Sequence, residues 1–444
     1  MISDSAHWLT TSSIYQINPR TFCQRGTINA VTEALPDLKK LGFKIIYLCP
    51  VFKEDDDDDK SFWSARQKAS DTENPKNPYR MNDYFEIDSE YGTMDDLKRF
   101  VATGHSLGMK VILDLVYLHI GPNADILKLH PEFAAQNADG SNKLTDWNFS
   151  YLNYDNEGLR EYLYCNMTYY IGVIDADGFR CDVGDGVPLD FWREGRRRIR
   201  AIKSDAIMIN EGTKAEYLDV FDANYCFDWH ASIFAILSGD ITSSEVMRKH
   251  MALRELTPAG KFLLRDMDNH DTVTDWPYRI EAHYGNDAME LILALNYAID
   301  GIPMVYCGNE LADKTRISMF ANRFHSGVFN ATDRTVIGPD VERRKEVIKK
   351  LNGLRENMPV FAYGDTKWLQ IKNDFVLAFQ RVTDDETISF VGNFSKQEVM
   401  ISASEPEIIL ADNNALVSDG KIILHSYGYI IVKGDPSFGS ADRL

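Results

Sequence analysis

Eight short apolar runs, rich in β-branched and aromatic residues, alternate with helix-like segments through most of the 444-residue sequence. This alternation is typical of βαβ units, in which each helix connects two parallel strands. Strands are predicted at 13–17, 45–50, 110–115, 178–183, 206–209, 223–227, 261–264 and 301–306. Eight alternations favour a closed (β/α)8 TIM barrel over an open, doubly wound sheet.

Helical patterns occupy the segments that follow these predicted strands. Helices are predicted at 29–41, 94–107, 158–171, 188–202, 243–253, 287–299 and 341–355. In the first of them, Gly42 marks the end and Pro36 is expected to break the helix, because proline cannot donate a backbone hydrogen bond.

The spacing changes in the last part of the chain. From about Trp368 onward, runs such as FVLAFQRV and KIILHSYGYIIVK alternate with turn residues, which predicts an antiparallel β module. The segment 120–154 is long and polar, as functional loops inside compact domains usually are. We expect a barrel from 1–119 and 155–362, a short excursion at 120–154 after the third strand, and a C-terminal antiparallel β-sandwich domain at 363–444.

The bulk properties exclude several classes of partner. The formal net charge of −19 argues against nucleic acid, whose phosphates need clustered Lys and Arg. No apolar run reaches the roughly 18 residues of a membrane span, and the first residues lack the features of a secretory signal. The six cysteines are scattered without CxxC spacing, which favours reduced thiols. We expect a cytoplasmic protein, and the oligomeric state is not predicted.

The acidic run KEDDDDDK, from Lys53 to Lys60, invites interpretation as a calcium loop. Consecutive carboxylates cannot all face one ion, and the run lacks the spaced ligands and the glycine of such a loop. It is expected to be a solvated loop whose charges repel one another.

Charged residues gather where the predicted strands end. Arg180 and Asp182 lie two residues apart in DADGFRCDVGDG, so a strand places both on one face. A lone acid at a strand end is often a helix cap or a salt bridge, but in a barrel all these ends meet at one rim. Carboxylates crowded there raise a pKa and supply an acid, which suits glycosidic bond cleavage. In chain order the rim residues are Asp114, His119, Arg180, Asp182, Glu211, Asn269, His270 and Asp271.

Four motifs resemble the conserved regions of the α-amylase family of glycoside hydrolases, in order and on the expected strands. They are DLVYLH (114–119), GFRCD (178–182), INE (209–211) and DNHD (268–271), and IYQINPR, YFEIDSEYGTMDDLKRF and GIPMVYCGNE are also similar to that family. The resemblance spans nearly the whole chain. It implies a retaining hydrolase that cleaves α-glucosidic bonds through a covalent glycosyl-enzyme intermediate.

The resemblance also implies roles for the matching acids. Asp182 would be the nucleophile, and Glu211 would be the general acid and then base, about 5 to 5.5 Å away as retention requires. Asp271 would hold sugar hydroxyls and stabilise the distorted transition state. Arg180 would keep Asp182 ionised, while the less compensated Glu211 would keep its proton.

Further positions would bind the sugar. By the same resemblance, His119 and His270 would donate hydrogen bonds to sugar hydroxyls, and Tyr79 would stack on the apolar face of the ring. Asp114 would have a structural or indirect role. The structural alternatives are an Arg180–Asp182 pair that only closes the barrel, and a tyrosine that belongs to the core.

Some positions depart from the family pattern. Leu118, Asn153 and Gly186 replace three ligands of calcium-dependent members, and leucine and glycine side chains offer no oxygen. We therefore expect no structural calcium and no other metal or cofactor. Asp185 and Gly186 also replace a Lys-His pair of endo-acting members. With a short third loop, this favours small oligosaccharide substrates, such as short malto-oligosaccharides or related α-glucosides, over polymer.

Two alternatives stay open. A transglycosylase or isomerase of the same family, of the glucanotransferase, trehalose synthase or sucrose-active type, would let a sugar hydroxyl replace water. A non-catalytic sugar-binding paralogue would typically lack one of the three acids, and all three are present.

Overall fold

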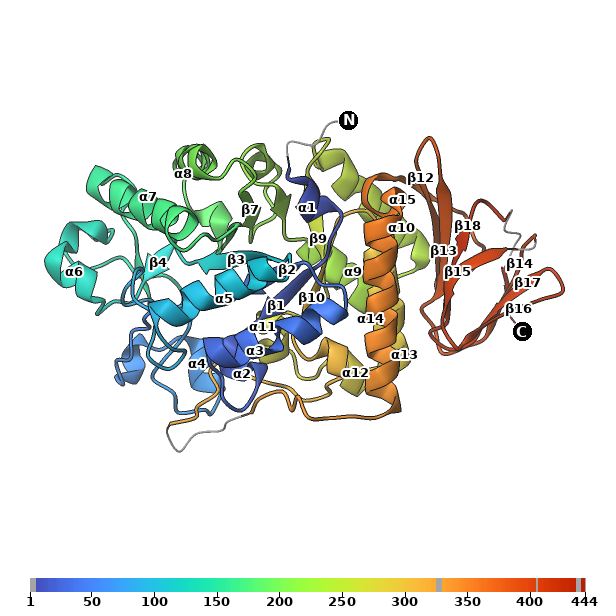
Figure 1. Ribbon diagram of the computed structural model, residues 1–444, viewed down its shortest axis with the longest axis horizontal. Coiled ribbons are helices and arrows are strands. Elements are labelled where there is room, and N and C mark those ends of the chain that lie inside the picture. The colour runs from blue at the N-terminus through green and yellow to red at the C-terminus, as the bar shows by residue number, and fades with distance from the viewer. Residues whose placement is uncertain (1–4, 325–329, 405, 437–440, 444) are drawn as a thin grey trace.

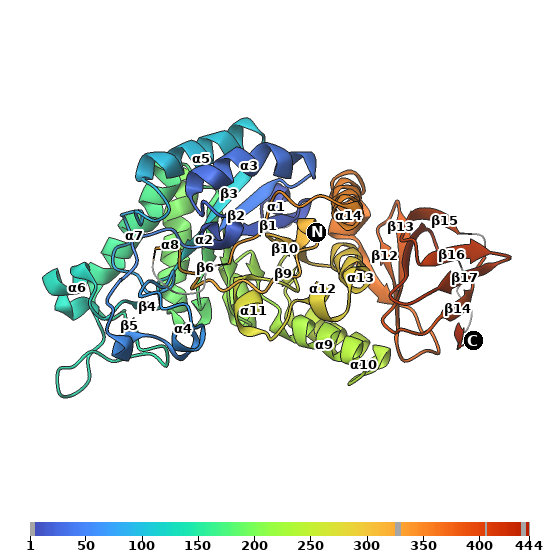
Figure 2. The same cartoon turned by 90° about the horizontal axis from the view of Figure 1, so that it is seen from below.

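The computed structural model describes residues 5–324, 330–404, 406–436 and 441–443. A helix-wrapped barrel forms one end of an elongated molecule, and antiparallel sheets form the other (Figures 1 and 2). Within the described ranges, no helix combines the length and the apolar character needed to cross a bilayer. All six cysteines are free thiols.

Eight parallel strands close the barrel, and each matches a predicted strand to within a few residues. They are β1 Ile14–Ile17, β2 Ile45–Leu48, β3 Lys110–Leu115, β6 Gly178–Cys181, β7 Ile207–Asn210, β8 Ala223–Asn224, β9 Phe262–Arg265 and β10 Ile302–Tyr306. Their order is β1-β10-β9-β8-β7-β6-β3-β2. The predicted barrel is confirmed. The strand predicted at 223–227 is too long, because Phe227 begins a helix.

Helices cover the outside of the barrel. The longer ones are α3 Ile28–Lys40, α5 Met94–Ser106, α7 Glu157–Gly172, α8 Leu189–Ile202, α9 Phe227–Ser238, α10 Ser243–Leu256, α13 Asn286–Ala298 and α14 Pro339–Asn357. The short ones are α1 His7–Thr10, α2 Pro19–Phe22, α4 Ala65–Ala69, α6 Asp125–Leu129, α11 His270–Asp275, α12 Ile280–His283 and α15 Pro359–Tyr363. The seven predicted helices are all present, and α9 is an addition.

The expected break at Pro36 is wrong, because α3 runs through this residue without ending. A proline inside a helix removes one backbone hydrogen bond. The apolar face of α3 compensates, since Val31, Leu35 and Leu38 are fully buried against the core. Each buried side chain of this size contributes about 1.5–3 kcal/mol.

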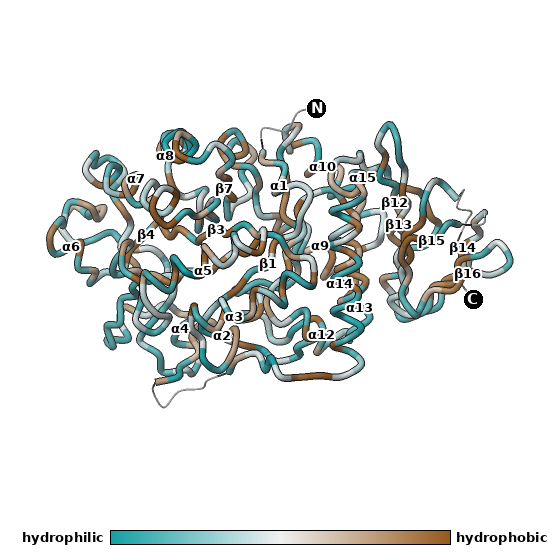
Figure 3. Tube along the Cα trace, viewed as in Figure 1, coloured by the Kyte–Doolittle hydropathy of each residue, from teal (hydrophilic) through white to brown (hydrophobic). Residues whose placement is uncertain are grey.

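Apolar residues line the barrel wall from both sides. Figure 3 shows hydrophobic segments along the barrel strands. Ile14, Ile45, Ile112, Ile207 and Ile302 belong to one interior cluster. Strands buried on both faces read as continuous apolar runs, which explains why they stand out in the sequence.

The excursion after the third barrel strand is confirmed. Its two strands, β4 His119–Ile120 and β5 Ser150–Tyr151, pair in antiparallel fashion with His119 opposite Tyr151. This small sheet therefore fixes His119 at the rim of the barrel.

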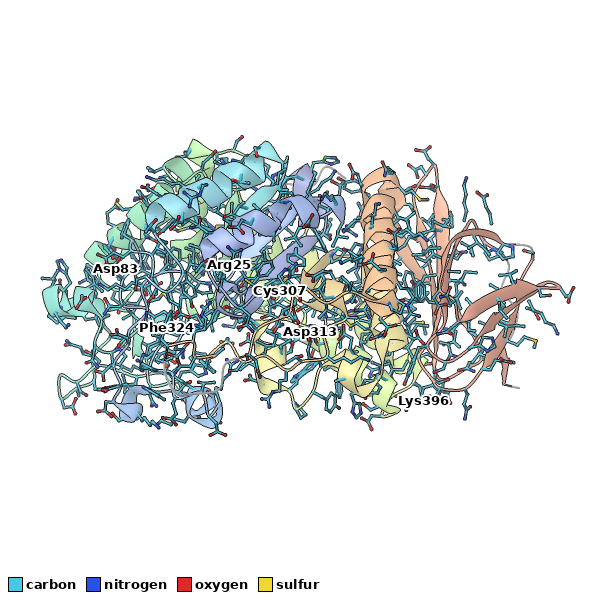
Figure 4. The ribbon with its side chains drawn as sticks, turned by 60° about the horizontal axis from the view of Figure 1, so that its bottom comes forward. Arg25, Asp83, Cys307, Asp313, Phe324 and Lys396 are labelled. Carbon is cyan, nitrogen blue, oxygen red and sulfur yellow. The ribbon has the colours of Figure 1, made fainter. Side chains whose placement is uncertain are left out.

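The C-terminal part folds into two antiparallel sheets, as predicted. Their strands are β11 Asp365–Trp368, β12 Val376–Val382, β13 Thr387–Asn393, β14 Val399–Ser402, β15 Glu407–Ala411, β16 Ala415–Ser418, β17 Lys421–Leu424, β18 Tyr429–Lys433 and β19 Ala441–Arg443. The sheet orders are β11-β12-β13-β18-β15 and β16-β17-β14-β19. Val391, Ile401 and Ile422 belong to one buried cluster that draws on both sheets. Lys396 lies where these sheets meet the barrel (Figure 4).

The acidic run at 53–60 is only partly the solvated loop that we expected. Glu54 and Asp55 are buried, and Arg20 contacts Glu54 at 2.7 Å. Arg80, also buried, lies 3.6 Å from Asp55. The expectation fails for these two acids because buried arginines from elsewhere in the chain neutralise them.

Candidate active site

Arg180 lies at the centre of a buried cluster of acids at the carboxyl end of the barrel. Its Nη1 donates hydrogen bonds to Asp114 Oδ1 at 2.8 Å and to Asp182 Oδ1 at 2.9 Å. Its Nη2 forms an ion pair with Glu211 Oε1 at 2.8 Å. One guanidinium, only 1% exposed, therefore joins acids from three neighbouring strands.

Strand register and a strained turn orient the side chains of these acids. Asp114 of β3 lies directly opposite Arg180 of β6, so the two side chains share a face. The chain turns sharply after Asp182, where Val183 adopts φ 42°, a left-handed conformation that is costly for a β-branched residue. The Val183 N–H donates to Glu211 Oε2 at 2.9 Å. The turn thus presents Asp182 and orients Glu211 at the same time.

Asp271 enters from the first turn of α11. Asn269 caps this helix by accepting hydrogen bonds from the N–H groups of Asp271 and Thr272, both at 2.9 Å. Arg66 forms an ion pair with Asp271 Oδ1 at 2.7 Å, and His270 Nε2 lies 3.2 Å from Asp271 Oδ2. The third acid is therefore held by its backbone and by two basic groups.

A chain of hydrogen bonds runs behind the acids. Gln16 Nε2 lies 2.8 Å from His270 Nδ1, and His270 Nε2 lies 2.6 Å from Tyr79 Oη. The Tyr79 hydroxyl donates to Asp114 Oδ2 at 3.0 Å, and the Tyr47 hydroxyl donates to the same oxygen at 2.5 Å. If the Gln16 amide donates to Nδ1, neutral His270 carries its proton on Nε2.

Burial favours the neutral form of both histidines. Burial lowers the pKa of His119 to about 3, and burial also lowers the pKa of His270. His119 Nε2 lies 3.7 Å from Asp182 Oδ2, and its ring packs between Trp147 and Phe149. Neutral imidazoles suit hydrogen bonding to uncharged hydroxyl groups.

These residues surround a cavity of about 250 Å³. The predicted residues that line it are Tyr79, His119, Asp182, Glu211, His270 and Asp271. Arg180 and Asp114, the remaining predicted residues, lie in the layer of charges directly behind it. All eight predicted site residues are therefore brought together.

The charge states differ from those we expected from the sequence. Burial raises the pKa of Asp182 well above its usual range, and burial also raises the pKa of Glu211. Burial acts in the same direction on Asp271, but His270, Arg66 and Arg180 lower its pKa to about 2. The prediction that Arg180 serves Asp182 while Glu211 is less compensated is wrong, because Arg180 contacts both. Both acids therefore bind a proton more readily than a free carboxyl group does.

Several residues of the site escaped the sequence analysis. The ring of Tyr225 lies 5.6 Å from the Arg180 guanidinium, close enough for cation–π attraction, and the predicted Tyr79 lies at 5.7 Å from the same group. Gln16 lies on strand β1 and Tyr47 on strand β2, both of them apolar barrel strands. Because side chains alternate between the two faces of a strand, their positions could have placed both side chains near the site. Arg66 lies on the short helix α4, where no motif marks it.

The residues that replace the calcium ligands do not fit a cation. Leu118 fills the space beside Gly186, since a Cβ there would lie 2.9 Å from a leucine methyl group. The Asn153 amide donates to the carbonyl of Glu132 at 3.1 Å. In the part of the chain that the structure describes, no group of three or more His, Cys, Asp or Glu side chains could hold a metal. The absence of calcium stays a prediction.

The chain is similar to known proteins over most of its length. The family described as alpha amylase, catalytic domain, matches residues 3–150. The alpha-amylase MalA of Haloarcula japonica is 25% identical over 90% of this chain and 57% of its own length. A maltogenic alpha-amylase of Bacillus acidopullulyticus is 27% identical over 84% of this chain and 64% of its own. The chain thus spans less than two thirds of these relatives.

A solved structure shares the whole fold. The crystal structure of an alpha-amylase from Lactobacillus plantarum has a TM-score of 0.79, with 24% identity over 96% of this chain and 99% of that one. This likeness extends the shared fold to the C-terminal sheets.

Proposed function

Because this chain belongs to the α-amylase family of glycoside hydrolases, we propose that it hydrolyses α-glucosidic bonds of short malto-oligosaccharides or related α-glucosides. One observation carries the proposal: Asp182, Glu211 and Asp271 line a single cavity. Relatives named maltogenic alpha-amylase and cyclomaltodextrinase support short gluco-oligosaccharides as substrates.

The proposed reaction uses the coupled acid pair in two steps. Asp182 attacks the anomeric carbon while Glu211 donates its proton to the glycosidic oxygen, so the bond to the leaving sugar breaks. Glu211 then takes a proton from water, which displaces Asp182 and restores the original α configuration. The reaction requires that Glu211 be protonated and Asp182 ionised when the glycosidic bond breaks.

The neighbours would bind and position the sugar. Ionised Asp271 would accept hydrogen bonds from ring hydroxyls and neutral His119 would donate them, and His270 would donate one by turning its Nε2 proton from the Tyr79 hydroxyl to the sugar. Asp114 would act through others, because it holds Arg180 and Tyr79 in place.

We also propose the domain boundaries and the cellular location of the protein. We assign the barrel to 1–119 and 155–362, the excursion to 120–154 and the β domain to 363–444. We also propose a cytoplasmic location, which the free cysteines and a relative named intracellular maltogenic amylase support.

Product analysis tests the proposal directly. The protein is incubated with maltose, maltotriose, trehalose, sucrose and isomaltose, and the sugars are separated over time. We expect free glucose as the accumulating product. Rearranged sugars in place of glucose would show a transglycosylase or isomerase, and sugar binding without any turnover would show a non-catalytic paralogue.

The pH dependence of kcat/KM should be bell-shaped. Activity needs one proton on the Asp182–Glu211 pair, so it falls at high pH when that proton is lost and at low pH when a second is gained. Asp271, with a pKa of about 2, stays charged between these limits. Fluoride leaves with little help from an acid. With α-glucosyl fluoride as substrate, the fall of kcat/KM at high pH should therefore be weaker than with a malto-oligosaccharide. An alkaline limb of equal strength for both substrates would contradict the role of Glu211.

Tyr79→Phe should lower kcat/KM by about 10- to 100-fold, the equivalent of losing buried hydrogen bonds worth about 1–3 kcal/mol. The change deletes the hydroxyl that links His270 to Asp114. Tyr117→Phe is the matched control, because its buried hydroxyl donates to Asn166 outside the cavity. Both variants are assayed for unfolding temperature and kcat/KM. Equal losses of kcat/KM would mean that Tyr79 is only a core residue.

A further inference from the structure

A second cavity lies beside the one that holds the acids. Its volume is about 570 Å³, and hydroxyl, carboxylate and guanidinium side chains such as Ser70, Thr72 and Arg316 line it. Arg66 and Asp275 line both cavities. These two residues therefore form part of the partition between them.

Ion pairs hold Arg66 across this partition. Its Nη2 lies 2.7 Å from Asp271 Oδ1, and its Nε lies 2.9 Å from Asp275 Oδ1. The two acids are four residues apart on α11, so they share one face of that helix. These three side chains form the Arg66 fork. Arg66 is 33% exposed, Asp271 31% and Asp275 44%, which places the fork at the boundary with solvent.

The backbone on one side of the fork is firmly fixed. The Met319 N–H donates to Thr274 Oγ1 at 3.0 Å, and Arg20 Nη1 donates to the Met319 carbonyl at 3.0 Å. Met319 and Phe320 line the inner cavity, whereas Ser318 and Ala321 line the outer one. These hydrogen bonds hold the stretch 318–321 in place as a common wall of the two cavities.

The helix that carries Arg66 is fixed as well. Ser64 caps α4 by accepting a hydrogen bond from the Gln67 N–H at 3.1 Å. The buried Gln67 amide donates to the carbonyls of Asn74 and Pro75, at 2.8 and 3.1 Å. The Arg66 side chain is therefore presented from an anchored turn and spans the space to α11.

The direction of the substrate follows from the proposed roles. Glu211 donates its proton to the glycosidic oxygen, so it marks the side of the leaving sugar. Asp271 would hold hydroxyls of the sugar whose bond is cleaved. On these roles, the partition beyond Asp271 would stand where the chain continues toward its non-reducing end.

We propose that Arg66 determines specificity by closing this side of the cavity after one sugar. The protein would then remove single glucose units from the non-reducing ends of short α-glucosides. This inference rests on the proposed hydrolase function. It adds that the outer cavity accepts a second glucose unit only when the Arg66 fork is removed.

The test compares the chain-length preference of the unmodified protein with that of Arg66→Ala. Release of p-nitrophenol is measured from p-nitrophenyl α-glucoside and from p-nitrophenyl α-maltoside, and the first products from maltopentaose are separated. The unmodified protein should prefer the glucoside and release glucose. In Arg66→Ala the maltoside-to-glucoside ratio of kcat/KM should rise about tenfold or more, and maltose should appear. Loss of the positive charge beside Asp271 would lower kcat/KM for the glucoside and the maltoside by the same factor. The ratio of the two values therefore reports only whether Arg66 blocks the second sugar.

Two further variants keep the test decisive. Asp275→Ala removes one wall residue but leaves the Arg66–Asp271 pair, so a smaller rise in the ratio is expected. Arg197→Ala, a surface arginine paired with Glu194, should leave the ratio unchanged. An unmodified protein that first releases maltose or longer sugars would overturn the inference alone, as would unchanged ratios in the variants. If Arg66→Ala does not fold, an unchanged ratio in Asp275→Ala overturns it. A protein inactive on all three substrates would overturn the hydrolase proposal as well.

Discussion

Asp182→Asn should lower kcat by about four orders of magnitude or more, the scale of losing a nucleophile. An amide cannot form the glycosyl ester, and the coupled pair loses the member that attacks. The fold should persist, because the side chain keeps its shape and Arg180 keeps its contacts with Asp114 and Glu211. The unfolding temperature should therefore change little.

Chemical rescue distinguishes this loss from a general defect. In the truncated variant Asp182→Gly, with α-glucosyl fluoride as substrate, azide can enter the space that the missing carboxylate leaves and displace fluoride, which gives the β-glucosyl azide. Asp185→Asn serves as the control, since this nearby acid holds the backbone N–H groups of Thr213 and Lys214. It should cost about tenfold at most. Turnover of Asp182→Asn within tenfold of the unmodified protein would contradict the assignment.

Arg180→Leu should damage both turnover and stability. We expect kcat to fall by about a thousandfold, because preorganised charge at the nucleophile and the acid is lost. We expect the free energy of unfolding to fall by about 3–5 kcal/mol at neutral pH, because three buried acids lose their shared cation. Without the cation the pKa values of Asp182 and Glu211 rise further, so the loss of stability should shrink at low pH, where both acids are protonated.

Urea unfolding at acidic and neutral pH, together with kcat, checks this prediction. Arg265→Leu is the matched control, because Arg265 is equally buried and donates to the Asp300 carbonyl away from the cavity. It should cost stability without a comparable loss of kcat. An Arg180→Leu protein that is destabilised but keeps its turnover would mean that this arginine only closes the barrel.

The barrel and the acids at its rim could be read from the sequence for a physical reason, whereas Tyr79 and the roles of the site residues came only from the family resemblance. Parallel strands are buried on both faces, so their apolar runs are easy to recognise. Because all strand ends meet at one rim, locating each strand also located its acid. The register that sets Asp114 opposite Arg180 follows from the same closure.

Contacts between distant segments could not be read in this way. Glu54 is buried against Arg20, which reaches it from the short helix α2, and nothing within the acidic run signals that partner. The sharing of Arg180 between Asp182 and Glu211 depends on side-chain directions across two strands. Arg66 lies on a helix too short to show periodicity, so its pair with Asp271 emerges only in three dimensions.

The central claim is that Asp182 forms a covalent bond to the sugar while Glu211 and Asp271 assist from the same cavity. It is tested most directly by mass spectrometry of the protein after reaction with a fluorinated α-glucosyl fluoride whose intermediate hydrolyses slowly. A glycosyl adduct on the peptide that contains Asp182 is the predicted result. An adduct on another residue, or none while the reagent is being consumed, would contradict the account.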